Sequence, residues 1–160
     1  MVLAVTGHRP TKVGGYSDAA FAKLVHLAEL VIPPLAPSRV LTGMALGWDQ
    51  AVAQACINLK IPFTGCLPCA GQDSQWPLQS RLQWQRLLRD PLCTTHHCST
   101  GAYAPWLMQA RNEYMVQHSD HLLALWDGSS GGTANCVHYA QRLSPPRPIT
   151  NCWSTFSTMK

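Results

Sequence analysis

The sequence predicts an α/β domain in which a doubly wound, mainly parallel sheet carries helices on both faces. Short apolar runs alternate along the chain with segments whose apolar residues recur at helical spacing. Glycine- and proline-containing turns separate the two kinds of segment. The 160 residues are 46% apolar and only 12% charged, which argues for one domain with a proper core and against a disordered chain or a coiled coil.

The N-terminal half contains three predicted strands and two predicted helices. The strands cover 2–5, 40–42 and 61–67, and each is an apolar run next to turn-forming residues. The first helix covers 17–32, because apolar residues recur there every three or four positions and a double proline follows. The second helix opens at Asp49 and continues the same periodic pattern.

The C-terminal half continues the alternation. Strands are predicted at 91–95, 121–126 and 148–150, and helices at 78–88, 105–118 and from the end of a glycine-rich turn to about 143. Strands that alternate with helices pair in parallel through crossover connections, so we expect one domain over 1–152. Residues 153–160 are mostly polar, and we expect a loose C-terminal tail there.

Charge and cysteine usage narrow the class of protein. The net charge of +4 comes from scattered basic residues, which suits a phosphate-bearing small ligand better than a nucleic acid that needs a dense basic face. No apolar run is long enough to span a membrane, and the N-terminus does not resemble a secretory signal. We therefore expect a cytoplasmic protein without a membrane partner, whose seven cysteines are reduced thiols.

The best single motif is the glycine-rich turn between the strand at 121–126 and the following helix. Glycines let the backbone approach a ligand closely, and a helix start offers unpaired N–H groups with a partial positive charge. Phosphate is the natural ligand of such a turn, although an ordinary glycine-rich loop has the same composition. The spacing matches neither the dinucleotide-binding fingerprint nor a P-loop. The candidate ligand-binding residues are Gly128, Ser129, Ser130, Gly131, Gly132 and Thr133.

Two further turns carry similar residues after the first and second strands. Because the carboxyl ends of parallel strands share one edge of the sheet, all three turns should converge there. Arg9 is then available as a phosphate partner, although taken alone it is also compatible with a surface cation. The candidate ligand-binding residues of these two turns are Gly7, His8, Arg9, Gly43, Met44, Ala45, Gly47 and Asp49.

The helix over 105–118 contributes a cation and an amide. Arg111 and Asn112 are candidate ligand-binding residues. Met108 and Met115 share a helical face with Arg111, so the alternative interpretation places the methionines in the core and the arginine at its rim.

A zinc site is the alternative to weigh for the cysteines. Cysteine and histidine occur at spacings seen in zinc proteins, but the first pair follows a strand and no complete metal motif is present. We expect neither a metal nor another cofactor, and the sequence does not decide whether these residues hold one: Cys66, Cys69, Cys93, His96, His97 and Cys98.

Four segments together resemble the SLOG superfamily, the Rossmann-like group named after the Smf/DNA-processing protein A and LOG proteins. They are VTGHRP (5–10), GMALGWDQ (43–50), MQARNE (108–113) and LWDGSSGGT (125–133). The resemblance is strongest to a small, mostly uncharacterised bacterial and phage branch. It implies a Rossmann-like fold, a nucleotide ligand over the strand ends, and a homodimer.

The resemblance also separates three functions. LOG enzymes hydrolyse the N-glycosidic bond of nucleoside monophosphates with a glutamate three residues after the threonine, where this chain has Cys136. The functional arginine of the LOG enzymes resembles Arg111, so the resemblance implies that Arg111 is a candidate catalytic residue. Asp127 is then a candidate catalytic carboxylate, with Asp49 as the other. The DNA-processing branch binds single-stranded DNA, and another branch senses signalling nucleotides. We expect a nucleotide-binding protein, with an N-glycosidic hydrolase and a single-stranded DNA binder as the alternatives.

Overall fold

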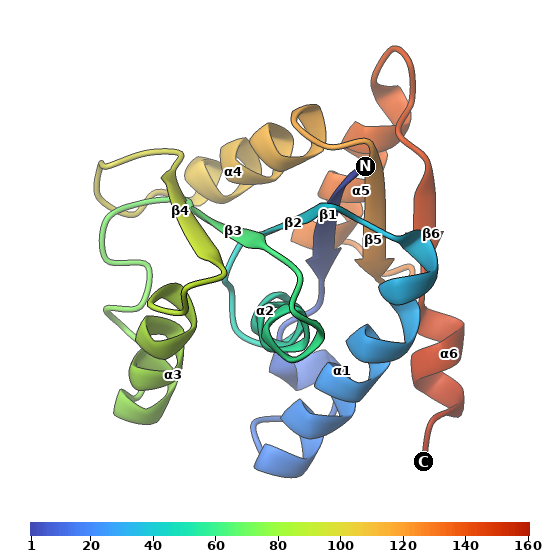
Figure 1. Ribbon diagram of the computed structural model, residues 1–160. Helices are drawn as coiled ribbons and strands as arrows, with labels where there is room; N and C mark the ends of the chain where they lie inside the picture. Colours follow the sequence, from blue (N-terminus) through green and yellow to red (C-terminus); the bar gives the residue numbers. More distant parts are fainter.

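The computed structural model describes residues 1–160 and contains one six-stranded parallel sheet (Figure 1). Its strands are β1 (Val2–Gly7), β2 (Arg39–Thr42), β3 (Phe63–Leu67), β4 (Cys93–His97), β5 (His121–Leu125) and β6 (Ile149–Asn151). Their order across the sheet is β4-β3-β2-β1-β5-β6, and every neighbouring pair is parallel. The predicted doubly wound α/β fold is confirmed.

Helices cover both faces of the sheet (Figure 1). They are α1 (Asp18–Val31), α2 (Trp48–Leu59), α3 (Leu78–Leu88), α4 (Pro105–Gln117), α5 (Gly132–Arg142) and α6 (Trp153–Thr158), with two short 3₁₀ turns, η1 (Pro10–Lys12) and η2 (Pro33–Leu35). In the view of Figure 1, α4 and α5 lie on one side of the sheet, and α1, α2, α3 and α6 lie on the other. None of the helices combines the length and the apolar character that a membrane span needs.

Strand pairing shifts two strands, β1 and β4, away from their predicted boundaries. β1 continues two residues further because Thr6 and Gly7 pair with Ala124 and Leu125 of β5. β4 starts and ends two residues later because its backbone pairs with the whole of β3. Both shifts follow from the neighbouring strand, which local composition does not reveal.

The central strands are buried on both faces, as the continuous apolar runs in the sequence predict. Successive side chains of a strand point to opposite faces, so Leu3 and Val5 join the larger apolar cluster under α1 and α2. Ala4 joins the smaller cluster under α4 and α5. The sheet thus separates two cores.

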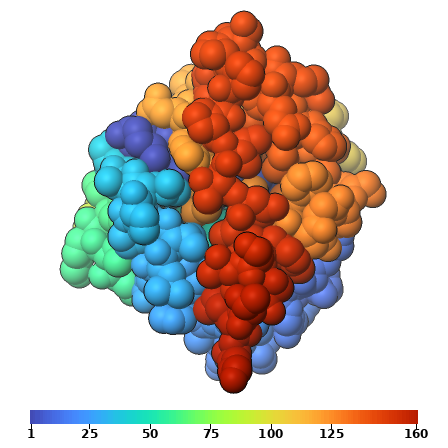
Figure 2. All heavy atoms as spheres, turned by 90° about the vertical axis from the view of Figure 1, so that its right-hand side faces the viewer, coloured from blue at the N-terminus to red at the C-terminus, as the bar shows by residue number.

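The expectation of a loose tail over 153–160 does not fit the structure, where α6 occupies most of that segment. Phe156 is buried in the larger core, and its ring receives the ammonium of Lys23 at 4.5 Å from the centroid. Trp153 packs against Phe156 and meets His8 edge-on. Figure 2 shows the C-terminal segment lying against the side of the molecule beside α1. Trp153 and Phe156 thus pack this otherwise mostly polar segment against the larger core.

The strand order reverses beside β1. The chain moves outward from β1 to β2, β3 and β4, and then returns to place β5 on the other side of β1. In open α/β sheets such a reversal leaves a crevice at the carboxyl ends of the two strands, where ligands bind. The fold therefore directs attention to the loops after β1 and β5.

Candidate functional site

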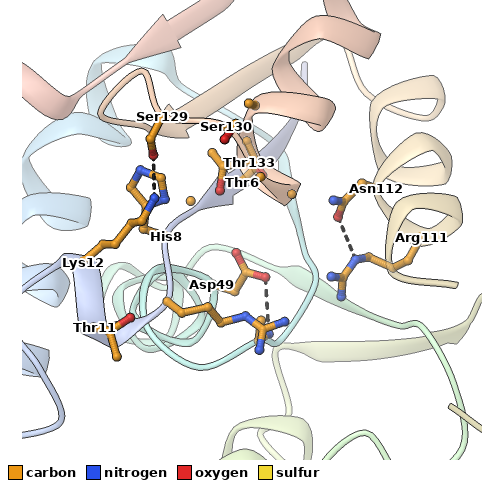
Figure 3. A pocket seen from close by; sticks show the side chains of 16 residues that line it. Thr6, His8, Thr11, Lys12, Asp49, Arg111, Asn112, Ser129, Ser130 and Thr133 are labelled. Atoms are coloured by element: carbon orange, nitrogen blue, oxygen red, sulfur yellow. Dashed lines mark hydrogen bonds between the residues drawn. The ribbon is translucent and has the colours of Figure 1, made fainter. Parts of the chain in front are cut away.

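A cavity of about 360 Å³ lies at this reversal, and only two of its 16 lining residues are hydrophobic (Figure 3). Its volume falls in the range of small-molecule sites, which usually have more hydrophobic residues in their lining. The two hydrophobic residues are alanines. The lining residues are Thr6, Gly7, His8, Arg9, Thr11, Lys12, Ala45, Asp49, Arg111, Asn112, Ser129, Ser130, Gly131, Gly132, Thr133 and Ala134.

The start of α5 forms one wall of the cavity. Gly131 is the N-cap, and no side chain caps this helix. The first intrahelical bond runs from Asn135 N to Gly131 O at 3.0 Å, so the N–H groups of Gly132, Thr133 and Ala134 have no acceptor in the chain. Unpaired N–H groups and the helix dipole make this wall attractive to an anion.

Arg111 of α4 forms a buried cation opposite that wall. Its side chain is 4% exposed, Nη1 donates to Gly43 O, and Nε donates to Asn112 Oδ1 at 2.9 Å. Its Nη2 makes no hydrogen bond within the chain, and no carboxylate oxygen lies within 4.0 Å of the guanidinium. The interpretation of Arg111 as a rim residue is therefore wrong. Its guanidinium is buried, and the carbonyl of Gly43 accepts a hydrogen bond from it there.

Asp49 is the one carboxylate that lines the cavity. It is 6% exposed, and Ala45 N donates to its Oδ2 at 3.3 Å. Burial raises the pKa of Asp49 above its ordinary value, although Arg111, the Ala45 N–H and Arg9 act in the opposite direction. Figure 3 shows Asp49 between the His8–Lys12 side of the cavity and Arg111. Its Oδ1 makes no hydrogen bond within the chain and is free to accept one from a ligand.

The loop after β1 adds two more cations. Arg9 and Lys12 line the cavity, and Lys12 Nζ donates to Ser129 Oγ across it. Three cations therefore face a single carboxylate. Since exposed charges are partly screened by water, the buried Arg111 contributes most to the positive potential.

Asp127, a candidate catalytic residue of the sequence, is hydrogen-bonded within the loop before α5. It lies outside the lining, and Ser129 donates to its Oδ1 from both the hydroxyl and the backbone N–H, the latter at 2.9 Å. His8 Nε2 lies 2.8 Å from the same oxygen. These contacts from Ser129 and then His8 hold the pKa of Asp127 well below its usual range. The carboxylate shapes the loop before α5.

The structure brings most of the predicted site residues to the same cavity and leaves five outside it. Met44 is fully buried in the core, and Gly43 contributes its carbonyl to Arg111 from behind the lining. Gly47, at φ +91°, starts α2, where a Cβ atom would lie 2.7 Å from His8 O. Those outside the lining are Gly43, Met44, Gly47, Asp127 and Gly128.

Four lining residues were absent from the sequence-based site: Thr6, Thr11, Lys12 and Ala134. Lys12 had a local signal, because it follows Arg9 by three residues in the same loop. Thr6 also had one, because it opens the turn after the predicted first strand, whereas Ala134 had none, since it follows the glycine-rich turn as an ordinary member of a helix. Their exposure to the cavity depends on how β1 and α5 pack.

The cysteines do not assemble into a metal centre. No three histidine, cysteine, aspartate or glutamate side chains converge as a metal ion requires, and all seven thiols are free. Cys136, at the position of the LOG glutamate, is fully buried, which raises its pKa to about 12. A neutral buried thiol does not replace a carboxylate in stabilising a cationic sugar-like transition state.

Comparisons with known proteins agree with the fold. The chain resembles the uncharacterized SPbeta prophage-derived protein YoqJ of Bacillus subtilis, with 33% identity over 135 residues that cover 75% of this chain and 79% of YoqJ. DNA processing protein A from Helicobacter pylori, whose single-stranded DNA binding mode has been described, superposes with a TM-score of 0.64 at 17% identity. The match covers 93% of this chain but only 63% of that protein.

A second solved structure, that of TM1055, superposes with a TM-score of 0.57 at 14% identity, covering 92% of this chain and 71% of that protein. At these identities the two structural matches show the fold alone. The family model YpsA, described as the YspA SLOG family, matches residues 3–144. Apart from Val2, this match covers the strands β1 to β5, and it covers all of the cavity lining. The chain therefore belongs to the YpsA family of SLOG proteins.

Proposed function

We propose that this protein binds a nucleotide or a nucleotide-derived signalling molecule, with phosphate at the start of α5 and the ribose near Asp49. The observation that carries the proposal is the uncapped helix start, which faces the buried and incompletely bonded guanidinium of Arg111 across one polar cavity. Helix N–H groups and an arginine fork are the donors that recognise phosphate. Asp49 Oδ1 would accept a hydrogen bond from a ribose hydroxyl.

Mass spectrometry of a nucleotide panel provides the first test. The protein is incubated with nucleoside monophosphates, NAD, ADP-ribose and cyclic nucleotides, and bound compounds are separated from free ones. We expect one class of nucleotide to be retained. If every compound of the panel passes through unbound at millimolar concentration, the proposal is wrong.

Arginine substitutions then locate the phosphate. Arg111→Met should weaken binding of the retained nucleotide about 10- to 150-fold, the usual range for a hydrogen bond to a charged group. Arg89→Met is the matched control, because Arg89 is exposed at the end of α3 and lies outside the cavity. Equal affinity of the two variants would place the phosphate elsewhere.

Asp49 supports a second candidate function, hydrolysis of the N-glycosidic bond of the bound nucleotide. A buried carboxylate with a raised pKa is the kind of group that transfers protons near neutral pH. Released base after prolonged incubation, lost in Asp49→Asn and retained in Asp127→Asn, would support the hydrolase. Intact nucleotide recovered from the wild-type protein would leave binding as the function.

A single-stranded DNA binder is the remaining alternative, because the structurally similar Helicobacter pylori protein binds such DNA. That function predicts an affinity for an oligonucleotide that falls steeply with salt, in proportion to the phosphates contacted. We expect weak and nearly salt-independent binding instead, since the cations of the site gather in one cavity of small-molecule size.

We further propose that the protein is a homodimer, as its resemblance to the LOG enzymes implies. Light scattering after size exclusion should give about twice the chain mass of 17.6 kDa. A mass equal to that of one chain would refute the dimer and leave the binding proposal intact.

A further inference from the structure

A second cavity of about 270 Å³ opens beside the first and differs from it in character. Its lining contains two aromatic rings, a methionine and two side-chain amides, whereas the first cavity holds charges and hydroxyls. It is lined by Arg9, Gly71, Gln72, Ser74, Gln75, Trp76, Tyr103 and Met108. Arg9 lines both cavities, so the two are adjacent at this residue.

The second cavity also belongs to the functional edge of the sheet. The segment over 68–77 follows β3, and the segment over 98–104 follows β4, so both leave the carboxyl ends of strands. Ala70 N donates to Gly101 O at 2.9 Å and ties the two segments together. The first segment is further held by Ser74 N to Gly71 O and Trp76 N to Asp73 O, both at 3.0 Å. These backbone hydrogen bonds support the walls of the second cavity.

A chain of hydrogen bonds joins the two cavities beneath Arg9. Trp84 Nε1 donates to Gln72 Oε1 at 3.1 Å, and Gln72 Nε2 donates to Gly43 O at 3.0 Å. The same carbonyl of Gly43 accepts from Arg111 Nη1 in the first cavity. Gln72 in the wall of the second cavity and Arg111 in the first therefore donate to the same backbone oxygen.

The aromatic rings are placed to receive a planar group. Tyr103 is 65% exposed, and its ring makes no contact with another aromatic residue of the chain. Trp76 meets Trp84 edge-on, with centroids 6.5 Å apart and planes at 89°, which orients its indole. Aromatic faces stack on planar heterocycles, and the guanidinium of Arg9 adds a cation–π partner.

We infer that the second cavity is a subsite for the planar ring of the ligand, which stacks against Tyr103 and Trp76 while its phosphate lies at the start of α5. This inference rests on the proposed nucleotide function and adds to it the position of the base. The amides of Gln72 and Gln75 lie where they can meet polar atoms at the ring edge. The ligand is then a nucleotide extended across Arg9, with charge at one end and the ring at the other.

The test compares two probes by isothermal titration calorimetry: AMP, which carries a purine ring, and ribose 5-phosphate, which lacks it. Stacking of one base is worth an affinity gain of about 5- to 150-fold, so AMP should bind tighter than ribose 5-phosphate by that factor. Tyr103→Leu should remove much of this gain and leave ribose 5-phosphate unchanged. Tyr103→Phe keeps the ring and should retain the gain.

Trp106→Leu is the matched control, because Trp106 is 69% exposed on α4 and lines neither cavity. Equal affinity of the wild-type protein for both probes would refute the ring subsite and leave the phosphate site standing. The ring subsite would also be refuted if the preference for AMP survived both Tyr103→Leu and Trp76→Leu. It would be refuted as well if Tyr103→Leu weakened the binding of AMP and of ribose 5-phosphate by the same factor. Failure of both probes to bind would refute the ring subsite, and failure of the whole nucleotide panel as well would overturn the proposed function itself.

Discussion

Gly43 is the position where a single added methyl group should perturb both the stability of the fold and the binding site. A Cβ atom there would lie 2.5 Å from Arg111 Cζ and 2.9 Å from its Nε. Favourable heavy-atom contacts begin near about 3.5 Å, so the guanidinium of Gly43→Ala must move by about 1 Å. The hydrogen bond from Nη1 to Gly43 O is then lost or distorted.

The magnitude follows from overpacking at a buried site. Extra atoms in a packed interior cost about 1–3 kcal/mol, and a value of about 2 kcal/mol lowers the Tm of a domain of this size by about 4–8 °C. Because Arg111 leaves its position, affinity for ribose 5-phosphate should fall about 10-fold or more. Calorimetric unfolding and titration measure the two effects on the same preparations.

Gly132→Ala is the control for stability. A Cβ atom at Gly132 meets no heavy atom within 4 Å, so we expect no loss and a gain of up to about 1 kcal/mol. If Gly43→Ala unfolds at the wild-type temperature and binds the probe equally well, Arg111 does not depend on the close approach of this glycine. The packing described for the site would then be wrong.

Three further predictions address the tail, the buried carboxylate and the thiols. Phe156→Ala should destabilise the protein by about 3 kcal/mol in urea unfolding, because it removes a buried aromatic ring, whereas a loose tail would show no change. Asp49→Asn should become increasingly stabilising relative to the wild type as pH rises above 3.8. The raised pKa of Asp49 in the folded protein contributes stability at low pH, and this contribution is lost as the carboxyl ionises. A difference in unfolding free energy that does not change with pH would contradict this. Among the thiols, Cys98 should be alkylated first by iodoacetamide near neutral pH. A hydrogen bond with Cys66 and then the charge of Arg111 lower the pKa of Cys98, whereas burial raises the pKa of Cys136 to about 12. Peptide mass spectrometry that finds another thiol modified first would reject this order.

Local signals in the sequence were sufficient to predict the strands of the sheet and the two glycine turns that reach the cavity. Continuous apolar runs identify central strands because both faces of those strands are buried. The glycine-rich segment before α5 identifies a helix start that no side chain caps. Both are properties of a few consecutive residues, and the wall formed by Gly131, Gly132 and Thr133 follows from them directly.

Contacts between distant segments decided the rest. Arg111 is buried because Gly43, 68 residues earlier in the chain, offers it a carbonyl and leaves room for it. Asp127 is committed to its own loop through Ser129 and through His8, which lies 119 residues away. The C-terminal segment is ordered because Phe156 reaches the core beneath α1. Pattern and propensity describe neighbours along the chain, whereas the environment of a charge or an aromatic ring is set by neighbours in space, and for that physical reason it emerges only in the folded protein.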